Sequence, residues 1–177
     1  MSSGSEFRRL RGNRTQQQMA FDLEGISRES VSSYETGRNP IPKDIASKAM
    51  RQFDDPRFAL TVASEYTDGA WAPALDGPAA DLYRTSVQTK CVEEFREAIE
   101  ALQKAVLNVQ PKYLDNFQKQ DIEKSGEEIA EAITAANTYL MVVCKDYKIS
   151  WLKIWARHKA KLIHKGFLRM VKGGDKK

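Results

Sequence analysis

The sequence predicts an all-α protein. Apolar residues recur every three or four positions through most of its 177 residues, the spacing of a helix that buries one face. Residues that favour helix starts and ends flank these segments. A stretch rich in glycine and proline at 67–78 separates two helical parts. We therefore expect an N-terminal domain over 1–66, a connection over 67–78 and a C-terminal helical domain over 79–177.

The first part predicts five short helices. A basic helix is expected over 7–14, followed by one that Thr15 caps, with Gln18 completing a capping box. The chain turns at Gly25, and Ser27 caps a polar third helix that ends near Gly37. A fourth helix is expected over 43–53. A fifth begins at Asp55-Pro56 and runs to about residue 66.

The third helix carries short hydrogen-bonding side chains on its expected outer face. Val31 and Tyr34 are three apart and would be buried. Their burial leaves outward a set of polar residues: Arg28, Glu29, Ser30, Ser32 and Ser33. Such a helix is suited to reading base edges in the major groove.

A family resemblance becomes specific in the same region. It is carried by Thr15-Gln16, Ala20, Gly25, Ile26-Ser27-Arg28, Val31-Ser32, Tyr34-Glu35 and Gly37. These residues together resemble the Cro/CI-type (XRE-type) helix-turn-helix family of phage and bacterial regulators, over roughly residues 6–53. One departure is that four residues, Phe21 to Glu24, separate Ala20 from Gly25 where the family usually has three.

The resemblance implies a five-helix lambda-repressor-like domain that binds double-stranded DNA as a dimer, as in prophage repressors. It implies base contacts from Arg28, Glu29 and Ser33 first, then Ser30 and Ser32. Arg28 could take a guanine bidentately, and Glu29 could accept from cytosine or hold Arg28. Phosphate contacts are expected from the helix before and the loop after: Thr15, Gln16, Gln17, Arg38, Asn39 and Lys43.

The C-terminal part predicts long helices with apolar seams. One helix is expected over 79–109, closed by Pro111, and its seam is Val92, Phe95, Ile99, Leu102, Val106 and Val109. Residues 112–124 predict a short helix or a structured loop. A capping-box pattern from Ser125 to Glu128 predicts the start of the next helix. Its seam is Ile129, Ile133, Ala136, Leu140, Val143 and Tyr147. The seams predict a hairpin or bundle core, with homodimerisation as the alternative.

The last segment, 149–172, predicts a basic helix. Its expected apolar side is Trp151, Leu152, Trp155, Ala156, Ile163, Phe167 and Val171. A basic ridge recurs at every fourth position: Lys153, Arg157, Lys161, Lys165 and Arg169. The ridge is open to three interpretations, namely a solvated face, a second contact with the DNA backbone, or a helix lying in a membrane interface.

Charge is segregated along the chain. Residues 1–60 hold ten Lys and Arg against eight Asp and Glu, a net of +2. Residues 61–144 hold seven against fourteen, a net of −7, and residues 145–177 hold eleven against two, a net of +9. A formal charge of +4 for the whole chain therefore conceals an acidic middle and a basic end that favours an anionic partner.

No pattern in the sequence predicts an enzyme, a metal site or a cofactor. His158 and His164 are six apart, so they do not form the i, i+4 pair of a helical metal site. The two cysteines, Cys91 and Cys144, form no CxxC pair and predict buried, reduced thiols in a cytoplasmic protein. The longest apolar run, from Tyr139 to Cys144, is far shorter than the ~20 residues of a membrane span.

We therefore expect a sequence-specific transcriptional regulator, repressor-like, that binds a two-fold operator as a homodimer or higher oligomer. The alternative is a protein-interaction module, such as an antitoxin or anti-repressor partner, that acts through the C-terminal domain on a protein or peptide.

Overall fold

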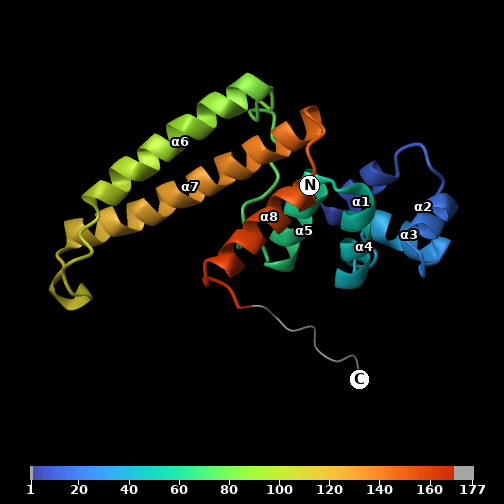
Figure 1. Ribbon diagram of the computed structural model, residues 1–177, viewed down its shortest axis with the longest axis horizontal. Coiled ribbons are helices and arrows are strands. Elements are labelled where there is room, and N and C mark those ends of the chain that lie inside the picture. The colour runs from blue at the N-terminus through green and yellow to red at the C-terminus, as the bar shows by residue number, and fades with distance from the viewer. Residues whose placement is uncertain (1, 170–177) are drawn as a thin grey trace.

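The computed structural model describes residues 2–169, and its secondary structure is entirely helical. The all-α class is therefore confirmed. The first five helices form a compact head, which lies to one side of the molecule in Figure 1. Their bounds are α1 Ser3–Arg11, α2 Gln16–Asp22, α3 Arg28–Glu35, α4 Lys43–Phe53 and α5 Pro56–Tyr66. The longer helices α6 and α7 form an antiparallel hairpin that extends away from this head.

The predicted helix ends in the head are confirmed at four positions. The Thr15 hydroxyl accepts from the Gln18 N–H, and the Gln18 side chain accepts from the Thr15 N–H. Ser27 caps α3, Asp55 caps α5 with a proline in its first turn, and Gly37 follows α3 at φ 70°. Only α1 begins earlier than expected, because Ser2 provides a cap and a capping box with Ser5.

The extra residue before the turn glycine lies in the left-handed region. After α2 ends, Glu24 adopts φ 42° and Gly25 adopts φ 82°. Two consecutive left-handed residues reverse the chain within a short space, and the glycine does so without steric cost. The Lys48 ammonium donates to the Glu24 carbonyl at 2.5 Å, which ties this turn to α4.

The core of the head is built on large side chains from all five helices. Phe7, Met19, Leu23, Val31 and Phe58 are fully buried. The Phe7 ring meets Phe58 at 6.2 Å and meets Tyr34 edge-on at 6.0 Å. The inward positions predicted for α3, Val31 and Tyr34, are thus confirmed.

The hairpin begins and ends at other residues than the sequence predicts. The first helix, α6, spans only Arg84–Lys104, and Pro111–Tyr113 forms the short 3₁₀-helix η1. The second helix, α7, spans Asn116–Asp146 and is capped by Asp115 with Gln118. The predicted start at Ser125 is therefore wrong. A real capping box lies ten residues earlier, and the Ser125 hydroxyl donates to the Ile122 carbonyl inside the helix.

The seam predicted to form the hairpin core faces outward on α6. Val92, Phe95, Ile99 and Leu102 are between 44% and 53% exposed. The buried residues of α6 are instead Val87, Cys91, Glu94, Ala98 and Ala101. On α7, Ala132 is buried and Ile133 is exposed. Small side chains let the two helices approach closely, so the hairpin packs through them and leaves the larger apolar residues outside.

A second core joins the head to the hairpin. Leu60 of α5 packs with Met141 and Val142 of α7 and with Trp151 of α8, which spans Trp151–His164. Ala74 from the connection also lies in this core. Of the apolar side predicted for the last helix, only Trp151 is buried, Ile163 is half-buried, and Val171 lies outside the described residues. The other members are exposed, because only Trp151 in the first turn of α8 and Ile154 pack into the second core.

Asp54 anchors α8 to the head. This residue ends α4 in the left-handed region, at φ 48°. Its carboxylate accepts from the Leu152 N–H at 2.8 Å and from the Ser150 hydroxyl. A carboxylate at the start of a helix satisfies free N–H groups and interacts favourably with the helix dipole. The end of one helix in the head therefore caps a helix almost a hundred residues later.

No helix among residues 2–169 is long and apolar enough to cross a membrane.

The contact between α1 and α3 predicts the effect of a methyl group at Gly4. A Cβ built there would lie 2.3 Å from the Tyr34 carbonyl oxygen, so α1 would have to shift. We expect Gly4→Ala to lower the free energy of unfolding in urea by roughly 1–3 kcal/mol. Gly126→Ala in α7 is the matched control, since a Cβ there meets nothing within 4 Å. It should be neutral or stabilising by up to about 1 kcal/mol. Equal effects at both sites would contradict the close contact.

The Asp54 cap predicts a local effect on α8. Glycine tolerates φ 48° and removes the carboxylate, so Asp54→Gly should destabilise the protein by about 1 kcal/mol through loss of the cap. Amide hydrogen exchange in α8 should accelerate more than in α2. The control is Asp68→Gly, because exposed Asp68 has nearly the same backbone conformation, φ 49°. If both variants behave alike, the Asp54 carboxylate contributes nothing beyond its backbone conformation.

Candidate nucleic-acid interface

The rotation of α3 about its axis is set by two inward side chains. Val31 is fully buried and Tyr34 is half-buried against Phe7. Since neighbouring residues are 100° apart on a helix, these contacts determine which side chains face solvent. Arg28 and Glu29 are exposed, and the three serines, Ser30, Ser32 and Ser33, are partly exposed. All five predicted base-contacting residues therefore reach the surface.

A shallow depression brings the predicted residues together. Its volume is about 530 Å³, and it is lined by Arg28, Glu29, Ser30, Ser32, Ser33, Arg38 and Asn39. The surface thus combines guanidinium donors, a carboxylate acceptor and three hydroxyls that can do either. These are the groups that distinguish base pairs by their edges.

Arg28 and Glu29 are weakly paired at the rim of this surface. The Arg28 Nε lies 3.3 Å from Glu29 Oε1, and both side chains are largely exposed. Backbone hydrogen bonding at the start of α3, helped by hydrogen bonds from Ser27 and Arg28, lowers the pKa of Glu29. Glu29 therefore stays ionised and able to accept hydrogen bonds, while Arg28 can turn to another acceptor at little cost.

Arg38 is held against α3 by neutral partners. Its Nη2 donates to the Ser32 hydroxyl at 3.3 Å, and its Nε donates to the Thr36 hydroxyl at 3.1 Å. Thr36 is itself anchored to the Ser32 carbonyl at 2.8 Å. The guanidinium charge is positioned by hydroxyl groups and not by a carboxylate. It therefore remains available to an anion.

The residues predicted to contact phosphate divide into two groups. Thr15, Gln17, Asn39 and Lys43 are exposed at the start of α2 and in the segment that follows α3. Gln16 is partly exposed, but its amide donates to Glu35 Oε2 at 2.9 Å. The Gln16 side chain is thus committed within the protein unless it rotates.

Glu35 has a structural task that the sequence analysis did not assign. Its nearly buried carboxylate accepts from the Arg11 Nε at 2.6 Å and from Gln16, so it joins α1, α2 and α3. The sequence places Glu35 directly after the inward Tyr34 at the end of α3, but it does not show the partners of the carboxylate. Which basic residue it would meet depended on the fold.

The residues predicted to form a basic ridge are exposed, but only Lys153, Arg157 and Lys161 lie on α8. The helix ends at His164, earlier than predicted, so Lys165 and Arg169 follow it on either side of the turn at Gly166. Lys153, Arg157, Lys161, Lys165 and Arg169 are all exposed, and among residues 2–169 no ion pair joins them to an acidic side chain. Arg157 donates to the Lys153 carbonyl at 3.3 Å. The ridge is therefore a second positive surface, separate in sequence from α3.

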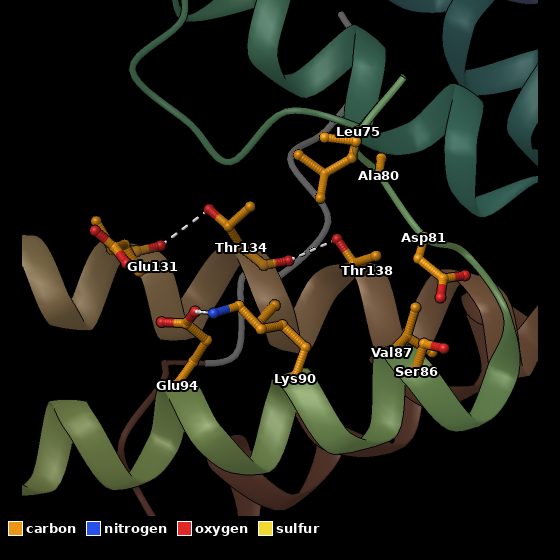
Figure 2. A pocket seen from close by; sticks show the side chains of 13 residues that line it. Leu75, Ala80, Asp81, Ser86, Val87, Lys90, Glu94, Glu131, Thr134 and Thr138 are labelled. Carbon is orange, nitrogen blue, oxygen red and sulfur yellow. Dashed lines mark hydrogen bonds and ion pairs between the residues drawn. The ribbon is translucent and has the colours of Figure 1, made fainter. Parts of the chain in front are cut away.

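The hairpin and the connection enclose a cavity of about 570 Å³. Figure 2 shows Leu75 and Ala80, from the segment between α5 and α6, facing Thr134 and Thr138 of α7, with Lys90 on the α6 side. Both threonine hydroxyls donate to backbone carbonyls of α7. The walls are mainly apolar, and their charged residues are Asp81, Glu131 and the Lys90–Glu94 ion pair.

Three carboxylates lie close together beside this cavity. Ligand atoms of Glu94, Glu128 and Glu131 lie within 4.8 Å of one another. Oxygen ligands of this kind suit hard cations such as Ca²⁺. However, the Lys90 ammonium lies 2.5 Å from Glu94 Oε1 and supplies a positive charge to the cluster. Within the described chain the lysine contacts only this one oxygen, while Glu94 Oε2 and Glu128 Oε2 are buried without a hydrogen-bond partner.

The cysteines are buried, as the sequence predicts. Burial raises the pKa of the Cys91 thiol, and burial together with the charge of Asp54 raises the pKa of the Cys144 thiol. Because the thiolate is the nucleophilic form, both side chains are poorly suited to covalent chemistry.

No family model, curated protein or solved structure matches this chain. What the surface around α3 can bind therefore follows from its own side chains.

The two ion pairs Lys90–Glu94 and Lys124–Glu128 in the hairpin are expected to contribute different amounts to the free energy of unfolding. Lys90→Met leaves the buried Glu94 carboxylate beside two others without its cation. We expect it to lower the free energy of unfolding by roughly 2 kcal/mol, below the cost for a fully buried pair because the ammonium is exposed. The control, Lys124→Met, breaks the longer 3.9 Å pair with Glu128 and should cost less than about 0.5 kcal/mol. Equal costs in urea unfolding would show that Lys90 does not neutralise the cluster.

Proposed function

We propose that the protein is a sequence-specific DNA-binding transcriptional regulator that reads the major groove with α3. The observation that carries the proposal is the depression lined by all five predicted base-contacting residues together with Arg38 and Asn39. The resemblance of residues 6–53 to XRE-type regulators supports the same function from the sequence pattern.

The chemistry of this surface suits bases better than an apolar ligand or a protein core. A bidentate contact from Arg28 to guanine would require only that it release its 3.3 Å contact with Glu29. Glu29 would then be free to accept from a cytosine amino group. The serines are short enough to let the helix approach the base edges closely.

The flanking residues suit the backbone of the same duplex. Thr15 and Gln17 precede α3 in the sequence, while Arg38, Asn39 and Lys43 follow it, and all five are exposed. Contacts of this kind position a protein on DNA without reading its sequence. Because they displace counterions, affinity should fall steeply with salt.

We infer regulation by operator occupancy. A small reading head has limited affinity alone, and two heads on half-sites about one helical turn apart would bind more tightly. Occupancy of such a site would block or recruit polymerase. The basic ridge of α8 offers a further contact with phosphates.

Because Arg28 is proposed to contact bases and Arg38 to contact phosphates, replacing each with alanine should change DNA affinity in a different way. Duplexes selected from a randomised pool and random duplexes would be compared by anisotropy at about 50 and 200 mM salt. Arg28→Ala should weaken the selected duplex roughly 10- to 100-fold and random duplexes little. Arg38→Ala should weaken both alike and reduce the slope of log affinity against log salt by about 1.

Arg96→Ala, which removes an exposed arginine on α6, is the control and should change neither affinity. If Arg28→Ala combined with Ser33→Ala leaves selectivity unchanged, α3 is not the reading helix. Arg157→Ala in the same assay tests the α8 ridge, where a contact would lower affinity for all duplexes.

A further inference from the structure

The cavity between the hairpin and the segment that joins α5 to α6 has the size of a small-molecule site. Its volume of about 570 Å³ falls within the range of about 300 to 1,000 Å³ that is typical of ligand pockets. The described residues that line it all lie between Leu75 and Thr138, outside the head. The cavity is therefore separate from the surface around α3.

Most of the cavity wall is apolar. Thr134 and Thr138 line it, but their hydroxyls donate to backbone carbonyls of α7 at 2.9 and 2.8 Å. Their donor groups are thus used within the helix. Apart from Ser86, the rest of the uncharged wall consists of Leu75, Ala79, Ala80, Val87, Ala130 and Ala135. Such a wall favours a ligand with an apolar body, because binding removes its apolar surface from water.

The charged residues of the wall are mainly acidic. Asp81, Glu94 and Glu131 provide three carboxylates and Lys90 provides one ammonium, a net charge of −2. Figure 2 shows Glu94 and Glu131 toward one end of the cavity and Asp81 toward the other. An excess of carboxylates attracts cations and repels anions. The cavity therefore favours a ligand with a positive charge.

Glu94 offers a buried acceptor at one end of the cavity. The residue is only 4% exposed, and its Oε2 is buried without a hydrogen-bond partner among residues 2–169. The Lys90 ammonium lies 2.5 Å from Oε1, so an ammonium group already fits against this carboxylate. A buried charged oxygen without a partner is costly. A ligand that donates to Oε2 would remove this cost.

An ammonium suits this end of the cavity better than a metal ion does. One oxygen of Glu94 and one of Glu131 lie within 4.8 Å of each other. A nitrogen between them can reach both, because an ammonium donates to a carboxylate over about 2.8 Å. A cation such as Ca²⁺ takes six to eight oxygen ligands, and the wall beside the carboxylates is mainly apolar.

We propose that this cavity binds a small organic amine. Its apolar body lies between α6, α7 and the segment before α6, and its ammonium lies between Glu94 and Glu131. The ammonium donates to Glu94 Oε2, which has no partner within the described chain. The Lys90 side chain is 63% exposed, so it can turn toward water as the ligand enters. The same carboxylates disfavour anionic ligands such as fatty acids.

The test compares three probes that share an eight-carbon chain and differ in the charge of the head group: octylamine, 1-octanol and octanoate. Each is titrated into the full chain without DNA at about pH 7, where the amine is protonated, and binding is followed by calorimetry. Octylamine should bind at least about 10-fold more tightly than octanol, because its hydrogen bonds to carboxylate are charge-assisted. Octanoate should bind more weakly than octanol.

Two variants locate the binding. Glu94→Gln keeps the shape of the side chain and removes its charge, so the affinity for octylamine should fall about 10-fold, to that for octanol. Ala135→Leu fills part of the cavity and should weaken both ligands at least about 10-fold, and leucine is a good helix former. Circular dichroism establishes that each variant is folded.

Glu93→Gln is the matched control. It removes a carboxylate from the neighbouring position of α6, which is exposed and outside the cavity wall. Because water and salt screen this charge, octylamine affinity should change less than about twofold. Equal losses in Glu93→Gln and Glu94→Gln would reduce the effect to the overall charge of the hairpin and overturn the proposal.

Three further results would overturn the proposal: no binding of octylamine, binding of octanoate as tight as that of octylamine, and equal affinity of the wild type and Glu94→Gln for octylamine. Calcium chloride is tested alongside. If Ca²⁺ raises the midpoint of thermal unfolding, Glu94→Gln abolishes that rise and octylamine does not bind, then the carboxylates hold a metal instead.

Amine binding is measured without DNA and involves residues outside the head. A chain that binds octylamine but no duplex would remove the proposed function and leave the cavity site standing. A chain that binds duplexes but not octylamine would do the reverse.

Discussion

The burial of Val31 and Tyr34 is the contact on which the presentation of α3 depends. It sets the rotation of a helix whose remaining residues are polar, and a polar helix has no other strong preference for one orientation. The Glu35 carboxylate then holds the end of α3 to Arg11 and Gln16. Gly4 allows α1 to lie against the last turn of α3. The outward set that lines the depression is a consequence of these inward contacts.

The head and the hairpin are coupled through a second core. Leu60 and Trp151 come from helices far apart in the sequence, and Asp54 caps α8 from the end of α4. Deleting the last helix would therefore expose apolar surface and take away the groups that donate to the Asp54 carboxylate, in addition to removing the basic ridge. The head and the hairpin are also joined by direct contact between α5 and α7.

The helix α6 has two apolar stripes, and only one of them is buried against α7. One stripe of α6 is small, with Ala98 and Ala101, and the other is large, with Phe95 and Ile99. The stripe of small side chains packs against α7, because it lets the two helix axes come close. A single neighbouring helix can cover only one of the two stripes. The large stripe then remains about half exposed.

The sequence by itself determined the helical class, most helix ends in the head and the outward face of α3. These follow from local chemistry: capping hydroxyls and carboxylates, left-handed glycines, and the three-and-four spacing of Val31 and Tyr34. Only the tertiary structure decided which stripe of α6 is buried and that Asp54 holds α8. The start of α7 at Asp115 was missed for another reason, because Asp115 and Gln118 form a local capping box that competes in the sequence with the similar pattern at Ser125. Periodicity identifies a face that can be buried but not what lies against it, because that neighbour is brought there by contacts between residues far apart in the chain.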